Sequence, residues 1–147
     1  MNKTKYPPPP EIEISYRYSR PINTYPKVTE PEQMYAVLDS IWNMESISHR
    51  EEIVVVFLNK ACRVLGYHRL GVGGIDSVIG DPKIIFQVAL KANASAIIVA
   101  HNHPSGDLTP SKSDYTLAKR LREIGEILGI EILDNIIMTQ ESYRSYK

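Results

Sequence analysis

Apolar and polar residues alternate near the start of the chain. One face of residues 11–18 carries only apolar or aromatic side chains, those of Ile12, Ile14, Tyr16 and Tyr18. This alternation predicts a strand that covers a core on one side. The four prolines at 7–10 fit neither a sheet interior nor a helix. We therefore expect residues 1–28 to form an extended proline-rich arm and edge strand, and residues 29–147 to form a single domain.

Three later stretches show apolar residues at helical spacing behind a polar start signal. The first begins at Thr29-Glu30-Pro31-Glu32 and ends near Asn43, the second begins at Asp81-Pro82, and the third runs from about Lys112 to Leu128, between a Ser111 cap and Gly129. The apolar side chains at helical spacing are predicted to face inward. In the first stretch these are Met34, Val37, Leu38, Ile41 and Trp42; in the second, Ile84, Ile85, Val88 and Ala89; and in the third, Leu117, Ala118, Leu121, Ile124 and Leu128.

Four further apolar runs read as strands. They are 51–58, its partner 63–70 beyond a turn at 59–62, the buried run 95–100, and 130–138. The predicted order is β–α–β–β–α–β–α–β, followed by a short tail. This order indicates an α/β domain with a layered mixed sheet and flanking helices.

Composition limits the class of protein. Lys+Arg and Asp+Glu both number 17, and the resulting zero net charge is unlike the basic domains that bind nucleic acids by counterion release. Cys62 is the only cysteine, so the chain has neither a disulfide framework nor a cysteine-based zinc site. No apolar segment is long enough to span a bilayer, and no signal peptide is seen, so we expect no membrane contact and a cytoplasmic setting.

Two histidines one residue apart follow the apolar run 95–100. In a strand, His101 and His103 point to the same side, and Asp114 lies in the first turn of the next predicted helix. Two imidazoles and a carboxylate leave a fourth tetrahedral position for water, which is typical of a catalytic zinc site. Ser111 is a candidate to stabilise an oxyanion beside it.

Two alternatives stay open on these residues alone. Ser111 and Asp114 also form a capping-box arrangement that needs no metal. The same two histidines and carboxylate can hold Fe(II) in oxygenases, so the ligands do not select the metal.

The string His-Asn-His-Pro-Ser-Gly-Asp-x-x-Pro-Ser-x-x-Asp, residues 101–114, resembles the RadC branch of the JAMM (JAB/MPN+) metalloproteases. The resemblance extends from about Glu51 to Tyr143. It implies a cytidine-deaminase-like JAB/MPN fold and Zn²⁺ bound by His101, His103 and Asp114.

The resemblance also assigns roles to two further residues. Ser111 matches the serine that stabilises the tetrahedral intermediate. Glu51 matches the glutamate that activates the water, by register with Phe57-Leu58-Asn59. Glu52 is expected on the opposite face of a regular strand. Leu108 stands where RadC-like chains usually have proline, and Asn135 stands where they have histidine.

The resemblance predicts a zinc-dependent hydrolase that cleaves a peptide or isopeptide amide bond in an unknown protein or peptide substrate. One alternative is a RadC-like module associated with DNA repair. Residues 1–48 show no helix-hairpin-helix segment, so nucleic-acid binding has little support. The other alternative is a non-catalytic MPN-type interaction domain. The sequence does not determine the substrate or the oligomeric state.

Overall fold

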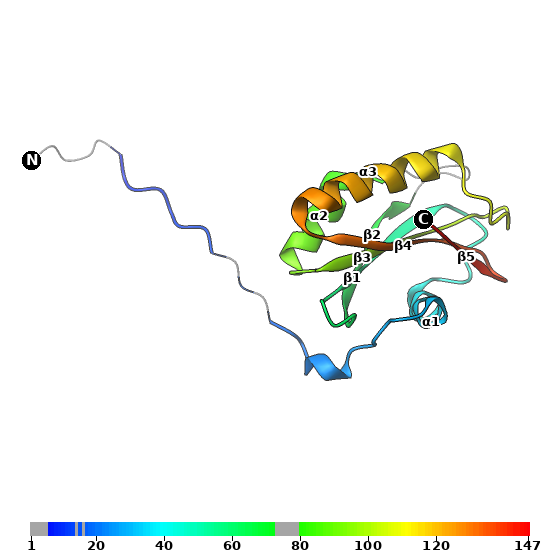
Figure 1. Cartoon of the computed structure of the whole chain (residues 1–147), viewed down its shortest axis with the longest axis horizontal. Helices are drawn as coiled ribbons and strands as arrows, with labels where there is room; N and C mark the ends of the chain where they lie inside the picture. The colour runs from blue at the N-terminus through cyan, green and yellow to red at the C-terminus, as the bar shows by residue number, and fades with distance from the viewer. Residues whose placement is uncertain (1–5, 14, 16, 73–79) are drawn as a thin grey trace, which may run out of the picture.

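A computed structural model describes residues 6–13, 15, 17–72 and 80–147 (Figure 1). The elements in chain order are η1 (Ile22–Thr24), α1 (Pro31–Ile41), β1 (Glu52–Leu58), β2 (Val64–Val72), α2 (Pro82–Lys91), β3 (Ala96–Asn102), α3 (Lys112–Leu128), β4 (Glu131–Met138) and β5 (Tyr143–Tyr146).

One mixed sheet organises these residues, with the strand order β2-β1-β3-β4-β5. β1 runs antiparallel to β2 and β3, β3 and β4 are parallel, and β5 returns antiparallel to β4. In Figure 1, α2 and α3 lie over one face and α1 lies against the other. Every residue of the central strands β1 and β3 is buried, as apolar strands covered on both faces should be. The expected α/β fold with a layered mixed sheet is confirmed.

The helices begin and end largely as their capping signals predict. α3 spans the predicted residues, from the Ser111 cap to Gly129, which adopts a left-handed φ of 69°. The Asp81 carboxylate accepts a hydrogen bond from the Lys83 N–H at the start of α2. The capping box expected from Thr29 to Glu32 is shifted by one residue and is formed by Glu30 and Gln33. Glu30 rather than Thr29 precedes this helix, because the Gln33 side chain turns back to accept the Glu30 N–H.

Two predicted features of the ends of the chain were wrong. The described residues of 11–18 form no strand, and Ile12 is 90% exposed. No sheet edge lies beside them, so the alternation has no core to cover; Ile14 and Tyr16 lie outside the described residues. The expected tail instead contains β5, which pairs with the edge of β4.

Smaller corrections concern inward faces and one loop. Ile84 and Leu128 are exposed, whereas Phe86 is buried against the sheet. β2 continues to Val72, two residues beyond the predicted strand 63–70; residues 73–79, in the glycine-containing stretch that follows, lie outside the described residues. Within the described part of the chain, no helix has the length and apolar character needed to cross a membrane.

Candidate metal centre

The histidine pair lies where β3 ends. His101 is buried in the strand, opposite Ile53 of β1 and Ile137 of β4. The backbone N–H of His103 donates to the carbonyl of Met138, which extends the pairing one residue beyond β3. This pairing keeps the chain extended, so both imidazoles point to the face covered by α3.

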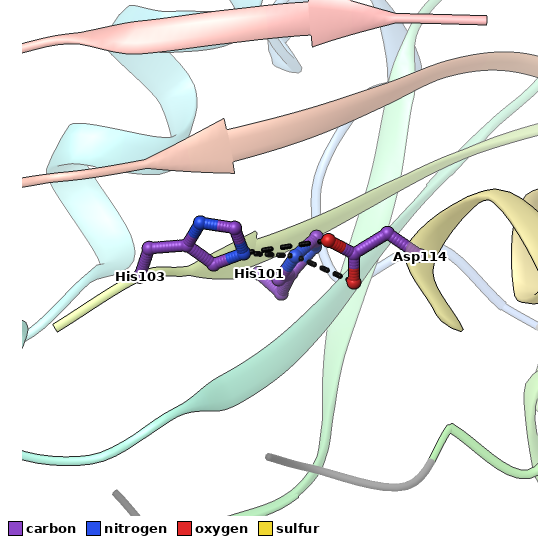
Figure 2. A group of neighbouring side chains, drawn as sticks. All are labelled: His101, His103 and Asp114. Carbon is purple, nitrogen blue, oxygen red and sulfur yellow. Dashed lines mark hydrogen bonds and ion pairs between the residues drawn. The ribbon is translucent and has the colours of Figure 1, made fainter. Parts of the chain in front are cut away.

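Asp114 reaches the same point from the first turn of α3, as Figure 2 shows. The Nε2 atoms of His101 and His103 are 3.0 Å apart. Asp114 Oδ1 lies 3.2 Å from the His101 nitrogen, and Oδ2 lies 3.4 Å from the His103 nitrogen. Three metal-binding side chains from a strand end and a helix start therefore converge on one point.

The spacing of these atoms fits a tetrahedral metal ion. Ligands bound at about 2.0–2.2 Å in tetrahedral geometry lie roughly 3.3–3.6 Å apart. The two nitrogens are 3.0 Å apart, and each lies 3.2–3.4 Å from a different oxygen of Asp114. One ligand atom from each residue can be chosen so that all three lie within 4.8 Å of one another. These three donors would suit a small divalent ion such as Zn²⁺, which commonly takes three protein ligands and a water at catalytic sites.

Asp114 is both a helix cap and a candidate ligand. Its Oδ2 accepts the Ser111 N–H at 2.7 Å, while its own N–H donates to Ser111 Oγ at 3.1 Å. Burial favours a higher pKa for the carboxyl, but hydrogen bonds from His101, His103 and the Ser111 N–H outweigh it and lower the pKa well below the usual range. The capping and metal-ligand interpretations are compatible.

The orientation of His103 is set by the turn that follows it. Its Nδ1 donates to the carbonyl of Asp107 at 2.6 Å, since a carbonyl can only accept. In the neutral ring this leaves the Nε2 lone pair directed at His101 and Asp114. The Asp114 carboxylate raises the pKa of His103, more than burial lowers it.

The two neighbouring glutamates lie on opposite sides of the sheet. Glu51 lines the cavity that contains the three candidate ligands, and its charge contributes to the raised pKa of His103. Glu52 instead forms an ion pair with Arg69 of β2, which also donates to the Ile41 carbonyl at the end of α1. Glu51 is therefore the carboxylate that faces the candidate metal centre.

Ser111 lines the same cavity as the ligands and Glu51. Its Oγ accepts the Asp114 N–H and lies 2.9 Å from the Ser113 hydroxyl. When Ser113 is the donor, both acceptor positions of Ser111 are filled and its own hydrogen is free to point into the cavity. In that arrangement the helix cap presents a hydroxyl donor beside the candidate ligand atoms.

Comparison with known proteins bears on this geometry. The family model for the RadC-like JAB domain matches residues 28–147. The chain belongs to this family. The RadC-like JAB domain accounts for the five-stranded sheet and its three helices, as the sequence resemblance predicts.

Relatives of this RadC-like chain carry names that state no activity. It is 36% identical over 137 residues to a UPF0758 protein of Thermotoga maritima, covering 92% of this chain and 60% of that protein. It is 41% identical over 128 residues to a UPF0758 protein of Staphylococcus carnosus, covering 87% of this chain and 55% of that protein. The chain thus spans little more than half the length of these relatives.

Asn102, which sequence reasoning missed, joins the two halves of the RadC-like site. It lies between the histidines and is fully buried. Its Oδ1 accepts the Glu52 N–H at 2.7 Å, and its Nδ2 donates to the carbonyls of Ile47 and Arg50 at 2.6 and 2.7 Å. These bonds attach the segment that carries Glu51 to the strand that carries the histidines. The available signal was a carboxamide side chain between the two histidines, at the end of a buried strand.

The cavity over these residues has a volume of about 950 Å³. It extends from the candidate ligands along α3 toward the sheet, past Leu117 and Ala118 on one wall and Ile53 and Val99 on the other. An open cleft of this size beside the candidate ligands can accommodate several residues of a peptide.

Proposed function

We propose that this chain is a zinc-dependent hydrolase of the JAMM type that cleaves a peptide or isopeptide amide bond through a metal-activated water. The observation that carries the proposal is the convergence of the His101, His103 and Asp114 ligand atoms within 4.8 Å of one another. Glu51 and Ser111 line the same cavity. Membership of the RadC-like JAB family supports it.

His101, His103 and Asp114 would hold the ion, with His103 oriented by the Asp107 carbonyl and Asp114 by the Ser111 N–H. When bound, zinc supplies a Lewis acid and a water whose pKa lies near 7. The residues around it then have to move a proton and stabilise a developing negative charge.

Glu51 is the proposed proton carrier. Its carboxylate takes a proton from the attacking water and passes it to the departing amine nitrogen, so that the amide bond breaks as the new carbon–oxygen bond forms. Ser111 donates its free hydroxyl hydrogen to the oxyanion of the tetrahedral intermediate. Both side chains lie on ordered backbone, at the start of β1 and at the cap of α3.

Zinc stoichiometry and peptide turnover test the proposal together. Wild type should bind one zinc per chain by elemental analysis and be stabilised by about 2.7 kcal/mol at a zinc concentration a hundredfold above Kd. The His101→Ala/His103→Ala variant should lose both effects. Cleavage of a peptide and isopeptide library is read by mass spectrometry.

Glu51→Gln separates binding from chemistry. This variant should keep its zinc and lose turnover by at least about a hundredfold, because the proton carrier is gone. Glu123→Gln, on the exposed side of α3, is the matched control and should behave as wild type. Equal zinc in wild type and the double-alanine variant would contradict the metal site. Zinc binding with no cleavage above the Glu51→Gln level would instead favour the non-catalytic interaction domain.

A further inference from the structure

Two polar side chains in the cavity have no role in the proposed chemistry. Asn135 of β4 is 3% exposed and Tyr146 of β5 is 9% exposed, and both line the cavity that contains the candidate ligands. Among the residues that the structure describes, neither the Asn135 amide nor the Tyr146 hydroxyl makes a side-chain hydrogen bond. Neither group belongs to the fully buried side-chain atoms that lack a partner, so their polar atoms remain accessible from the cavity. Two largely buried residues thus present hydrogen-bonding groups to the cavity that are not used within the fold, and a ligand in the cavity can bind them.

The sheet register places these two groups together. Asn135 and Tyr146 are directly opposite partners in the antiparallel β4–β5 pair, which brings their side chains to one face with Cβ atoms about 4.5–5.5 Å apart. The Tyr146 ring meets the His101 ring edge-on, with centroids 6.3 Å apart. The amide and the hydroxyl therefore form one polar patch that adjoins the metal ligands.

The register also gives the distance from the reacting centre. Val99 pairs with Asn135, and His101 pairs with Ile137, so Asn135 lies two residues behind His101 along the strand direction. At about 3.3 Å per residue this is roughly 7 Å. An extended peptide covers that distance in about two residues.

The chemistry of the patch selects its ligand. A carboxamide side chain presents both a donor and an acceptor, and a phenol adds one more of each. The cavity walls beside them are apolar, formed by Val99 and Ala118. Lys112 and Arg120 line the same cavity. A carboxylate beside Tyr146 would nevertheless lose part of its hydration and meet the negative charges of Asp114 and Asp134, which already act on the phenol, whereas a neutral amide would find matched partners.

We propose that Asn135 and Tyr146 form a subsite that binds a carboxamide group of the substrate, one to two residues from the bond that is cleaved. The substrate role of this subsite depends on the proposed hydrolase function, but its ligand chemistry does not. The carboxamide has two sources, a backbone peptide group or the side chain of an Asn or Gln residue, and small probes distinguish them.

The test follows the side-chain amide signals of the ¹⁵N-labelled full chain by NMR, with and without zinc. Acetamide mimics an Asn or Gln side chain, N-methylacetamide mimics a backbone peptide group, and acetate is the charged control. The Asn135 amide signal, assigned by its loss in Asn135→Leu, should shift in a saturable manner with one or both amides. The signal of Asn102, whose amide is fully bonded within the fold, is the internal control and should not move.

Two variants test whether Asn135 and Tyr146 are the side chains that bind the amide. Affinity for the preferred amide should fall at least about tenfold in Asn135→Leu and by a smaller factor in Tyr146→Phe, which removes only the hydroxyl. Tighter binding of acetamide assigns a side-chain carboxamide, and tighter binding of N-methylacetamide assigns a backbone group. Equal shifts with acetate, or an Asn135 signal that none of the probes moves, would overturn the subsite even in a chain that cleaves peptides. Amide binding in a chain that fails to bind zinc would refute the hydrolase proposal alone.

Discussion

Single polar side chains at this site each serve the fold and the proposed chemistry together. Asp114 caps α3 and contacts both histidines, and Ser111 caps the same helix while its hydroxyl lies in the cavity. Asn102 completes three backbone hydrogen bonds between the histidine strand and the glutamate segment. Replacing any of these residues therefore changes stability as well as function, and tests must separate the two.

Asn102→Ala should destabilise the chain by about 3 kcal/mol, because it leaves a buried N–H and two carbonyls without partners. Urea unfolding measures the loss. Asn59→Ala also removes an amide bonded to backbone, but at an exposed turn, and should cost only about 1 kcal/mol. Equal urea midpoints of unfolding for the two variants would show that Asn102 does not hold the histidine strand and the glutamate segment together.

The Ser111→Gly variant tests separately the contribution of Ser111 to helix stability and the contribution of its hydroxyl to turnover. Glycine at a helix N-cap costs only a few tenths of a kcal/mol relative to serine, whereas loss of one oxyanion donor lowers kcat by about 10²-fold. Ser111→Thr keeps a hydroxyl and should retain most of the turnover. Thermal unfolding and steady-state kinetics read the two effects; unchanged kcat in Ser111→Gly would exclude the oxyanion role.

At the scale of elements, the site depends on how α3 connects two parallel strands. β3 and β4 run side by side, and α3 must return along the sheet between them, so its N-terminus lies at the end of β3 where the histidines are. On the other face of the sheet, Arg69 joins β1, β2 and the end of α1 through Glu52 and the Ile41 carbonyl. One connection brings the ligands together, and the other secures the strand that follows Glu51.

Gly125→Ala should destabilise the chain, although alanine in a helix is about 1 kcal/mol more favourable than glycine. A Cβ at this position would lie 2.4 Å from the Ile130 carbonyl oxygen, so α3 must move away from the start of β4. We expect a net loss of about 2 kcal/mol by chemical denaturation. Glu126→Ala, next to it in the same helix, should change stability by less than about 0.5 kcal/mol. A gain in stability for Gly125→Ala would contradict the close contact.

Arg69→Met should cost at least about 2 kcal/mol, because the buried Glu52 carboxylate loses its ion-pair partner. Glu52→Gln in the same background removes the charge and should recover part of the loss. A double-mutant cycle of unfolding free energies measures the coupling. Additive losses would show that the ion pair contributes nothing to holding β1 against β2.

At the scale of the whole molecule, the core and the arm are distinct. The sheet and its helices bury two apolar clusters, one beneath α1 and one beneath α2 and α3. The described residues between 6 and 20 are all exposed, and Figure 1 shows this part of the chain extending away from the sheet. Val28 is the first buried residue along the described part of the chain, and its N–H donates to the Cys62 carbonyl.

Deletion of residues 1–17 should therefore leave the melting temperature within about 1 °C of that of the intact chain, because the described residues there bury no apolar surface. Val28→Ala, at the edge of the core, should lower stability by about 1–2 kcal/mol. Differential scanning calorimetry compares the two variants. A large fall on deleting the arm would mean that it packs on the domain.

The sequence by itself determined the features that local chemistry controls. The bounds of α3 follow from its capping residues and Gly129, and the buried central strands follow from their apolar runs. The predicted grouping of His101, His103 and Asp114 as candidate ligands follows from their spacing along the chain. Each signal lies within a few residues of the feature it predicts, so a single sequence was enough to find it.

Only the tertiary structure decided what depends on pairing between distant segments. Residues 11–18 alternate like a strand but find no sheet edge, whereas 143–146 form β5 because β4 offers one. The separate placements of Glu51 and Glu52, the bonds of Asn102 to a segment about 50 residues away, and the meeting of Asn135 with Tyr146 all come from sheet register. Register is set by which strands lie side by side, and no local pattern contains that information.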